Sequence, residues 1–552
     1  MIDKPRALIC AVVFCLAAAV GGGARAAEVY PGCAVPPTTF NHVWYIDPVN
    51  GKPPADGGNG SRSAPWNSLQ GVVSSTKQSG YNYPMLSTVT YDHYPQKNAQ
   101  GARFYADGPS SDPTRVQPGD EILLMGGQYG DISIGAWAAP TTNSAFVTIA
   151  AAPGQMPVLS TLALTAASHF VFSGIKVQST PDGAPGEARP LVAVSDQDSA
   201  RPSSNIVFTN MLVTSADDTS GWTKAQWLAQ VHGVGIFVRG GDHGADTTCV
   251  SVTNSHISNV IFGLNIFANN MLLSGNEIDH FGDDGVDYAA SNILITKNYI
   301  HDNLDFVDGA HPDGMQGYPG SFTNVVIDSN RVIRQTEPNL PFPTILQGID
   351  AFDGDWTKLT VTNNVVVTSA CHGITYGSVH GGEIANNTVL DDGTDVVTKA
   401  TAGKVKCRPG ITVADKTHQG SPSNDVVIRN NIANGLSIYN VNPDMTMDHN
   451  ICVTIDGKCG ILTYTSKFFG GKPKWGVDRP GEYGDHNIVD QRGAGGTFVN
   501  FDPGKFVFDL RLKPEARAIG AGNPADAPPV DITGAARGTR IDAGAYQHGP
   551  GQ

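Results

Sequence analysis

The sequence is poor in charged residues, which make up 16% of its 552 positions against roughly 25% in an average globular chain. Basic residues are the scarcer kind, because 36 Lys and Arg stand against 51 Asp and Glu and leave a formal net charge of −15. Without a basic stripe to neutralise phosphates, nucleic acid is not an expected partner. The scarcity of charge also excludes a coiled coil and a highly charged disordered tail. The chain is instead rich in glycine, with 64 residues, and its apolar fraction of 40% is enough to bury a large core.

Long apolar runs are missing as well. Residues 7–20 form an apolar run behind two basic residues, but this run is short for a membrane span. Ala24 and Ala26 supply the small residues of a cleavage signal. We therefore expect a signal peptide over residues 1–26, no membrane span, and a secreted or periplasmic mature protein.

The cysteines show no zinc-binding spacing. Two of the eight, Cys10 and Cys15, leave with the signal peptide. The remaining six are Cys33, Cys249, Cys371, Cys407, Cys452 and Cys459. Because export favours oxidation, we expect local disulfides such as Cys452–Cys459, or inert buried thiols.

A repeat dominates the middle of the chain. Each unit is a short β-rich run, an Asn or Asn pair and another apolar pair, and most units recur near every 22 residues. The recurring positions are Asn254, Asn276, Asn298, Asn330, Asn364, Asn387, Asn431 and Asn450. Asn tolerates the left-handed backbone of a sharp turn, and its amide can bond the Asn one rung away. The pattern predicts an all-β fold, a single-stranded right-handed parallel β-helix that is monomeric.

Two non-repetitive ends flank this solenoid. We expect residues 27–160 to form an amino-terminal capping region with the first rungs, residues 161–500 the β-helix, and residues 501–552 a carboxyl-terminal cap. Both ends are interpreted as caps that protect the open edges of the solenoid from aggregation.

Acidic residues gather when the rungs are aligned on the Gly that opens each third strand. The residue two after that Gly gives one expected outward column, formed by Asn265, Asp287, Gln316, Asp350 and Thr375. The residue before it gives a second, formed by Asp284, Asp313, Gln347 and His372. Neighbouring rungs lie about 4.8 Å apart, so Asp283 and His311 should join these acids in one patch.

Like charges stacked at this distance require compensation, either a bound cation or retained protons. Several hard oxygen ligands from adjacent rungs suit Ca²⁺, which takes six to eight oxygens in loose geometry. Zinc favours His or Cys, and only His311 and His372 are near. Calcium is therefore the expected cofactor.

The run Asp283-Asp284-Gly285-Val286-Asp287 resembles the calcium motif of pectate-lyase-type polysaccharide lyases, nearest to family 9. The resemblance implies that Asp283, Asp284 and Asp287 are calcium ligands and that the substrate is a uronate-containing polysaccharide. In that family a later strand supplies a Lys base. The matching strand here reads Gly314-Met315-Gln316, so Gln316 occupies the Lys position.

β-Elimination needs a base that removes a proton made acidic by neutralising the adjacent carboxylate. We predict His311 as this base, since histidine titrates near neutral pH, with Asp313, Gln316 and Asp350 as further catalytic groups. Reserve candidates for the base include Lys297. The predicted substrate-binding residues, chosen for rings that stack on sugars or for charge, are Tyr288, Tyr318, Arg331, Arg334, His372 and Trp356.

Three other functions stay open from the residues alone. Paired carboxylates also serve glycoside hydrolases, and Asp284 with Asp313 or Asp287 with Asp350 have suitable expected spacings. A uronate C5-epimerase shares the proton abstraction of a lyase. A non-catalytic surface or matrix protein could bind calcium through the same ladder of acids.

Overall fold

The structure is a computed structural model. It describes residues 28–73, 96–97, 103–104, 116–135, 141–179, 189–196, 202–240, 247–394, 408–414, 422–439, 444–455, 457, 459–464, 486–525 and 527–549. The predicted signal peptide, residues 1–26, lies outside the described residues. No helix in the described ranges has both the length and the apolar composition needed to cross a bilayer.

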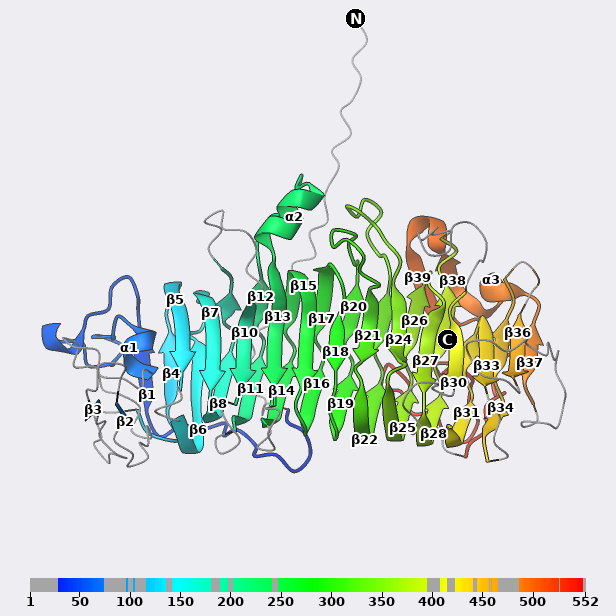
Figure 1. Cartoon of the computed structure of the whole chain (residues 1–552), viewed down its shortest axis with the longest axis horizontal. Helices are drawn as coiled ribbons and strands as arrows, with labels where there is room; N and C mark the ends of the chain where they lie inside the picture. The colour runs from blue at the N-terminus through cyan, green and yellow to red at the C-terminus, as the bar shows by residue number, and fades with distance from the viewer. Residues whose placement is uncertain are drawn as a thin grey trace, which may run out of the picture.

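The chain winds as a right-handed parallel β-helix, as predicted, with three short strands in each full coil (Figure 1). The first strands of the coils stack into one 13-stranded sheet, here called the first face. Its strands are β1 (Val43–Ile46), β4 (Glu121–Leu124), β6 (Thr141–Ala151), β8 (Ala167–Ser173), β11 (Ser204–Thr209), β14 (Thr248–Thr253), β16 (Met271–Ser274), β19 (Ile293–Thr296), β22 (Gly320–Asp328), β25 (Gly354–Thr362), β28 (Val379–Ala385), β31 (Asn424–Arg429) and β34 (Thr446–Asp448).

The other strands form a 22-stranded sheet that folds around a corner into a second and a third face. Two long strands, β7 (Pro157–Thr165) and β15 (His256–Phe267), pair with strands of both faces, and β5 (Gly127–Ile134) pairs along its length with β7. The second face also holds β9 (Lys176–Val177), β12 (Leu212–Thr214), β17 (Glu277–Phe281), β20 (Tyr299–His301), β23 (Arg331–Ile333), β26 (Val365–Thr368), β29 (Thr388–Asp391), β32 (Ile432–Ala433), β35 (Ile451–Val453) and β37 (Ile488–Asp490). The third face holds β10 (Pro190–Ser195), β13 (His232–Arg239), β18 (Val286–Tyr288), β21 (Asp313–Gly317), β24 (Gln347–Ala351), β27 (His372–Gly377), β30 (Gly410–Ala414), β33 (Gly435–Tyr439) and β36 (Gly460–Tyr464).

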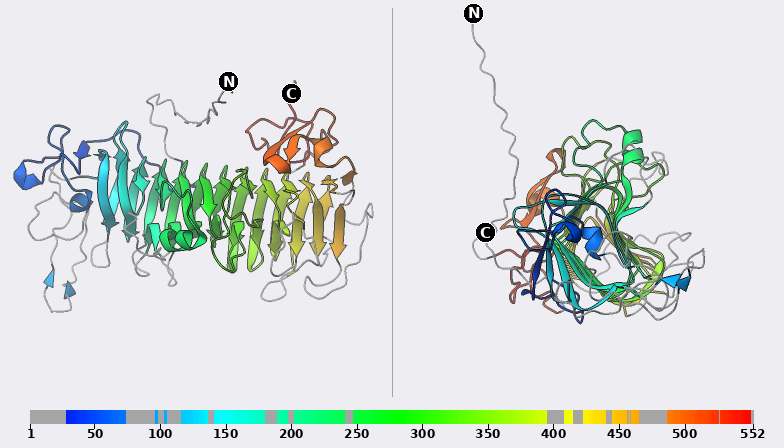
Figure 2. Two further views of the ribbon diagram at one scale, coloured as in Figure 1. Left: turned by 90° about the horizontal axis from the view of Figure 1, so that it is seen from above. Right: turned by 90° about the vertical axis from the view of Figure 1, so that its left-hand side faces the viewer.

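Few elements depart from this plan. They are the helices α1 (Leu69–Val73), α2 (Lys224–Gln230) and α3 (Gly493–Thr497), the 3-10 turns η1 (Pro54–Asp56) and η2 (Pro503–Lys505), and the antiparallel pairs β2 (Gln96–Lys97) with β3 (Arg103–Phe104) and β38 (Phe498–Asp502) with β39 (Val507–Leu512). Helix α2 projects from one edge of the coil, and the carboxyl-terminal segment lies on a different side (Figure 2).

The core is one continuous apolar cluster inside the coil. Alternate residues of each strand point inward, so that Val286, Met315 and Ile349 stack on successive rungs, fully buried. The Asn residues form a second internal column at the turn between the first and second faces. This Asn ladder consists of Asn276, Asn298, Asn330, Asn364, Asn387, Asn431, Asn450 and Asn487.

Each rung of the Asn ladder repeats the same hydrogen bonds. The backbone N–H and the side-chain amide of Asn298 both donate to Asn330 Oδ1 at 2.9 Å. The left-handed residue, however, is the one before each ladder position, such as Lys297 with φ 57°. Asn254 is one of these preceding residues and was misplaced in the predicted column, because Ser255 occupies the ladder position and donates its N–H to Asn276 Oδ1.

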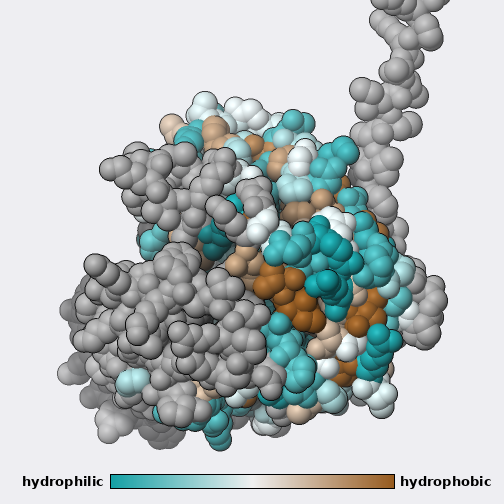
Figure 3. All heavy atoms as spheres, turned by 90° about the vertical axis from the view of Figure 1, so that its right-hand side faces the viewer, coloured by the Kyte–Doolittle hydropathy of each residue, from teal (hydrophilic) through white to brown (hydrophobic). Residues whose placement is uncertain are grey.

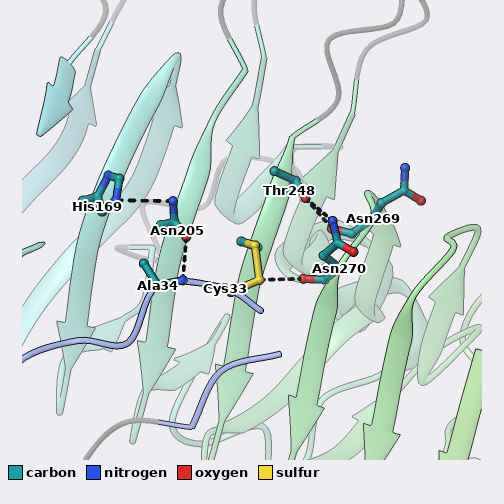
Figure 4. The surroundings of a disulfide bond; sticks show 8 residues. Cys33, Ala34, His169, Asn205, Thr248, Asn269 and Asn270 are labelled. Atoms are coloured by element: carbon teal, nitrogen blue, oxygen red, sulfur yellow. Dashed lines mark hydrogen bonds between the residues drawn. A yellow bond between two sulfur atoms is a disulfide. The ribbon is translucent and has the colours of Figure 1, made fainter. Parts of the chain in front are cut away.

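The first and the last described segments of the chain lie against the sides of the solenoid. A disulfide between Cys33 and Cys249 ties the amino-terminal segment to β14, and Ala34 N–H donates to Asn205 Oδ1 beside it (Figure 4). The predicted Cys452–Cys459 disulfide is present. The carboxyl-terminal segment packs on outward residues of the second face, including Val365, rather than only on the last rung. At that end of the molecule, apolar side chains lie among hydrophilic ones on the described surface (Figure 3).

Candidate functional site

The third face carries the predicted outward column. Strand register pairs Asn265 with Asp287, Asp287 with Gln316, Gln316 with Asp350, and Asp350 with Thr375. The column forms because the residues on either side of each of these positions point into the core. The alignment on the strand-opening Gly therefore predicted the register correctly.

The second predicted column lies beside the first on the same strands. Asp313 pairs with Gln347 across β21 and β24. One rung below, the backbone N–H of Asp313 donates to Asp284 Oδ1 at 2.8 Å. The two columns bring Asp284, Asp287, Asp313 and Asp350 together and, with Asp283 at the edge, form what we call the acidic cluster.

Most of the acidic cluster is closed from solvent. Asp287 and Asp313 are 0% exposed and Asp350 is 1% exposed. In the described ranges, neither oxygen of Asp287 and neither oxygen of Asp313 has a partner at full hydrogen-bond geometry. The polar groups beside them are Asp284 and the Tyr318 hydroxyl for Asp287, and the Asp350 carboxyl for Asp313. A buried carboxylate without donors is costly, so these groups must retain protons or share a cation.

The electrostatics of the acidic cluster follow from this burial. Burial, and then the charge of Asp284, raises the pKa of Asp287 and of Asp313 well above the ordinary value. Burial, and then Asp313, does the same to the pKa of Asp350. Burial together with Asp283 raises the pKa of Asp284 to about 7.

Four side chains form the accessible rim of the acidic cluster. The His311 side chain is 67% exposed, and its Nδ1 lies 3.5 Å from Asp313 Oδ2. Asp283, Gln316 and Tyr318 are partly exposed. Burial raises the pKa of Asp283 while His311 lowers it, and burial with the charge of Asp287 raises the pKa of Tyr318. The structure therefore brings His311 and Tyr318 to the acids, as the sequence predicted.

Two loops rise from the corner between the second and third faces and border the acidic cluster. Residues 302–312 lead into β21 and residues 334–346 lead into β24. They meet through the Leu304–Pro343 bridge and pack on Trp227 of α2, which projects from the same edge (Figure 1). Lys224 of α2 also contacts Asp305 Oδ2 at 2.6 Å. The lid-like position of α2 thus depends on apolar packing and one ion pair.

Two predicted substrate-binding aromatics are core residues, which corrects the prediction. Tyr288 and Trp356 are both 0% exposed, and the Tyr288 hydroxyl hydrogen-bonds that of Tyr376 at 2.8 Å. The reason for Tyr288 is strand alternation: Asp287 points outward, so the next side chain points inward. Trp356 lies on β25 of the first face and packs between Tyr288 and Tyr376 inside the coil.

The predicted basic residues lie apart from the acidic columns. Arg331 follows a ladder Asn, so it lies on the second face, with its guanidinium 4.7 Å from the Tyr299 ring centre. Arg334 is 3% exposed and forms an ion pair with Asp392, which corrects its predicted contact with substrate. Lys297 is exposed at the turn between the first and second faces. His372 follows Gln347 in its column and packs edge-on against Phe352, and burial lowers its pKa to about 4.

The acidic cluster offers the type of donor atom that a hard cation takes, although in the described ranges no three of its acids have donor atoms that all lie within 4.8 Å of one another. Its free atoms are carboxylate oxygens, the preferred ligands of Ca²⁺ at about 2.3–2.6 Å. Asp283, Asp284 and Asp287 are the predicted ligands, and the orphaned oxygens of Asp287 and Asp313 are the strongest observation in favour. Opposite ligands of such an ion lie about 5 Å apart, so the oxygens need not all touch one another.

Sequence reasoning missed a second polar group, on the second face. Glu277, Asp279 and His301 are the one set of three His, Cys, Asp or Glu side chains in the described ranges whose donor atoms all lie within 4.8 Å of one another. The signal was available in the ladder register, because Glu277 and Asp279 follow Asn276 just as Tyr299 and His301 follow Asn298. The alignment on Gly residues covers only strands of the third face, so it does not predict this column on the second face.

Comparison with known proteins supports the architecture. A family model described as "Right handed beta helix region" matches residues 199–389. A search of curated proteins found no match to this chain.

Solved structures similar to this chain include carbohydrate-active enzymes. Pectate lyase Pel9A is 13% identical with a TM-score of 0.41, and the match covers 94% of this chain and 98% of that one. GH136 lacto-N-biosidase from Eubacterium ramulus is 10% identical with a TM-score of 0.38, covering 81% and 67%. The PL6 alginate lyase AlyGC is 15% identical with a TM-score of 0.33, covering 75% and 57%. At such identities the function has to be argued from the residues of the site.

Proposed function

We propose that this protein is an exported enzyme that cleaves a uronate-containing polysaccharide by calcium-assisted β-elimination at the acidic cluster. The observation that carries the proposal is the pair of buried carboxylates, Asp287 and Asp313, whose oxygens have no partner at full hydrogen-bond geometry among the residues that the structure describes. A cation compensates such groups without requiring that they contact the sugar themselves.

Burial separates the roles of the acids from that of the base. Asp287, Asp313 and Asp350 are too enclosed to contact a sugar, which supports roles as ligands or as groups that orient a neighbour. His311 is open to solvent and adjoins Asp313, with Nδ1 at 3.5 Å from Asp313 Oδ2, so its imidazole can reach both the acidic cluster and a bound sugar. We therefore assign His311 as the base that takes the proton from C5 of the uronate.

The remaining groups of the rim hold the substrate. Calcium, when bound by Asp283, Asp284 and Asp287, neutralises the uronate carboxylate and so makes the C5 proton more acidic. Gln316 cannot act as a base, but its amide donates hydrogen bonds to a carboxylate or hydroxyl. Tyr318 offers a partly exposed ring and hydroxyl beside Asp287.

The proposal is tested by incubating the purified protein with uronate polymers, pectate and alginate, with calcium and with a chelator. Elimination gives a conjugated double bond, so ultraviolet absorbance should rise together with reducing ends, and the chelator should stop both. His311→Ala should lower kcat by about 10²–10⁴-fold, the usual contribution of a general base, while calcium binding stays intact. Full activity of the His311→Ala variant would exclude His311 as the base.

A glycoside hydrolase is the second candidate, and one observation favours it. Burial and Asp283 raise the pKa of Asp284 to about 7, which is suitable for a general acid beside an ionised partner. A hydrolase would release reducing ends without ultraviolet absorbance, and a chelator would not stop it.

A further inference from the structure

A second cluster of ligating side chains lies on the second face, in a position that the proposed reaction does not use. It consists of His256 on β15, Glu277 and Asp279 on β17, and His301 on β20, and we call it the histidine site. Strand register places His256 beside Glu277, and Asp279 beside His301, on three successive strands. All four side chains point outward, because Ile257, Ile278 and Ile300 between them are buried in the core.

We propose that Glu277, Asp279 and His301 bind a divalent transition-metal ion on the second face, separately from the acidic cluster. Their donor atoms all lie within 4.8 Å of one another. The His301 Nε2 to Glu277 Oε1 distance is 3.3 Å. Two ligands at tetrahedral positions, each about 2.0–2.1 Å from a zinc ion, are separated by about 3.3 Å, so this pair already has the required spacing.

The orientation of His301 is the strongest support. Its Nδ1 contacts Asp302 Oδ2 at 2.6 Å, and in this arrangement Nδ1 donates its proton to the carboxylate. Nε2 then faces Glu277, so it must either carry a second proton or bind a cation. A histidine held by a carboxylate through one nitrogen and free to ligate through the other is the usual arrangement at protein metal sites.

Asp302 is itself held in place. It is 0% exposed and accepts hydrogen bonds from Thr336 N at 2.6 Å and Thr336 Oγ1 at 2.5 Å. Asp302 begins one of the two corner loops that border the acidic cluster, and Thr336 lies in the other. The support of the histidine site therefore joins the roots of both loops.

Two further histidines hold Asp279 in place. His256 Nε2 contacts Asp279 Oδ2 at 2.5 Å, and His280 Nδ1 contacts Asp279 Oδ1 at 2.6 Å, so Asp279 would bind an ion through a remaining lone pair. Glu277 is 50% exposed at the outer side, so an ion has access from solvent. One imidazole with two carboxylates suits zinc, nickel or iron better than calcium, which prefers oxygen ligands.

The test is isothermal titration calorimetry of Zn²⁺ into the untagged, metal-stripped full chain. We expect one saturable site, with affinity lowered at least about 100-fold in His301→Ala and in Glu277→Gln, and about 10–100-fold in Asp302→Asn. The matched control is His380→Ala, because His380 Nε2 lies 3.8 Å from Asp355 Oδ1 in a pair that has no third ligand in the described ranges. Co²⁺ in place of Zn²⁺ should give a visible absorption band that the Glu277→Gln variant loses.

Folding and location are controlled separately. The thermal melt of each metal-free variant shows whether it folds, and Glu277→Gln is the conservative change at a half-exposed position. Asp287→Asn should leave Zn²⁺ affinity unchanged, since it alters only the acidic cluster. The absence of saturable Zn²⁺ binding, or binding that survives both His301→Ala and Glu277→Gln, would overturn the proposal.

Discussion

Two columns of polar side chains run along the same β-helix, and both are buried, but they differ in their hydrogen bonds. In the Asn ladder, Asn330 Oδ1 accepts two bonds from Asn298, and its amide donates to Asn364 Oδ1 at 3.0 Å and to Ile295 O at 2.9 Å. In the acidic cluster, no oxygen of Asp287 or Asp313 has a partner at full hydrogen-bond geometry in the described part of the chain. The rungs thus stack satisfied amides at one corner and unsatisfied carboxylates on another face.

The difference teaches how to separate structure from function in a repeat protein. A buried polar group with every bond made stabilises a unique register. A buried carboxylate with none destabilises the fold until a ligand arrives, and such groups are typical of functional sites. The two columns should therefore respond oppositely to the loss of one side chain.

The largest expected effect is on activity, at Asp287. Asp287→Asn keeps the shape of the side chain but removes one negative charge, so calcium should bind weakly and turnover should fall about 10²–10³-fold, as after loss of other electrostatic contacts of a transition state. Because the variant also relieves repulsion, its melting temperature without calcium should equal or exceed that of the parent. Turnover and thermal melts on the same preparation check both expectations.

The matched control for Asp287→Asn is Thr412→Val, which lies in the same outward column beyond Thr375. It should retain activity within about twofold, as is usual for substitutions away from a functional site. If Asp287→Asn stays fully active, the acidic cluster is not the reaction centre.

The second effect is on stability, at the Asn ladder. Asn330→Ala leaves the amide and the N–H of Asn298 without their acceptor inside the fold. Each buried unsatisfied group costs about 1–3 kcal/mol, so the free energy of unfolding should fall by roughly 3 kcal/mol in denaturant titrations. The exposed Asn59 is the control, and Asn59→Ala should cost under about 1 kcal/mol. If Asn330→Ala and Asn59→Ala lose equal free energy of unfolding, the Asn ladder does not have the stabilising role assigned to it.

The third effect is the pH dependence of the metal-free protein. Folding raises the pKa of Asp287, Asp313 and Asp350 above the unfolded value of about 3.9, so the folded state holds more protons above that pH. The free energy of unfolding should therefore fall as pH rises from about 4 toward neutrality, by at most about 1.4 kcal/mol per pH unit for each group.

Asp287→Asn should reduce this slope, and saturating calcium should reduce it in the parent protein. Chemical denaturation at several pH values, with and without calcium, gives the slopes. A slope that is identical in the parent and in Asp287→Asn would contradict the assignment of raised pKa values to the acidic cluster.

The smallest effect concerns a core residue that the sequence had placed at the site. Tyr288→Phe removes one hydrogen bond to Tyr376, so the free energy of unfolding should fall by about 1 kcal/mol while KM stays unchanged. A large rise in KM in Tyr288→Phe would instead indicate that Tyr288 contacts the substrate.

The periodicity of the sequence predicts most of the fold and part of the candidate site. The spacing of Gly before Asp287, Gln316 and Asp350 was enough to align the third face, since register fixes which side chains share a column. The prediction that Tyr288 binds substrate was wrong, because strand alternation turns its side chain into the core whatever the chemistry of its ring. The partners of Arg334 could not be predicted, because Asp392 belongs to a loop root whose path depends on tertiary packing.

The most direct test of the central claim is calcium-dependent elimination by the parent protein and by Asp287→Asn, followed as ultraviolet absorbance on uronate polymers. The account predicts absorbance that rises with calcium in the parent, stops with a chelator, and is absent in Asp287→Asn although this variant melts cooperatively. Absorbance that persists in the chelator, or reducing ends released without absorbance, would contradict a calcium-assisted elimination at the acidic cluster.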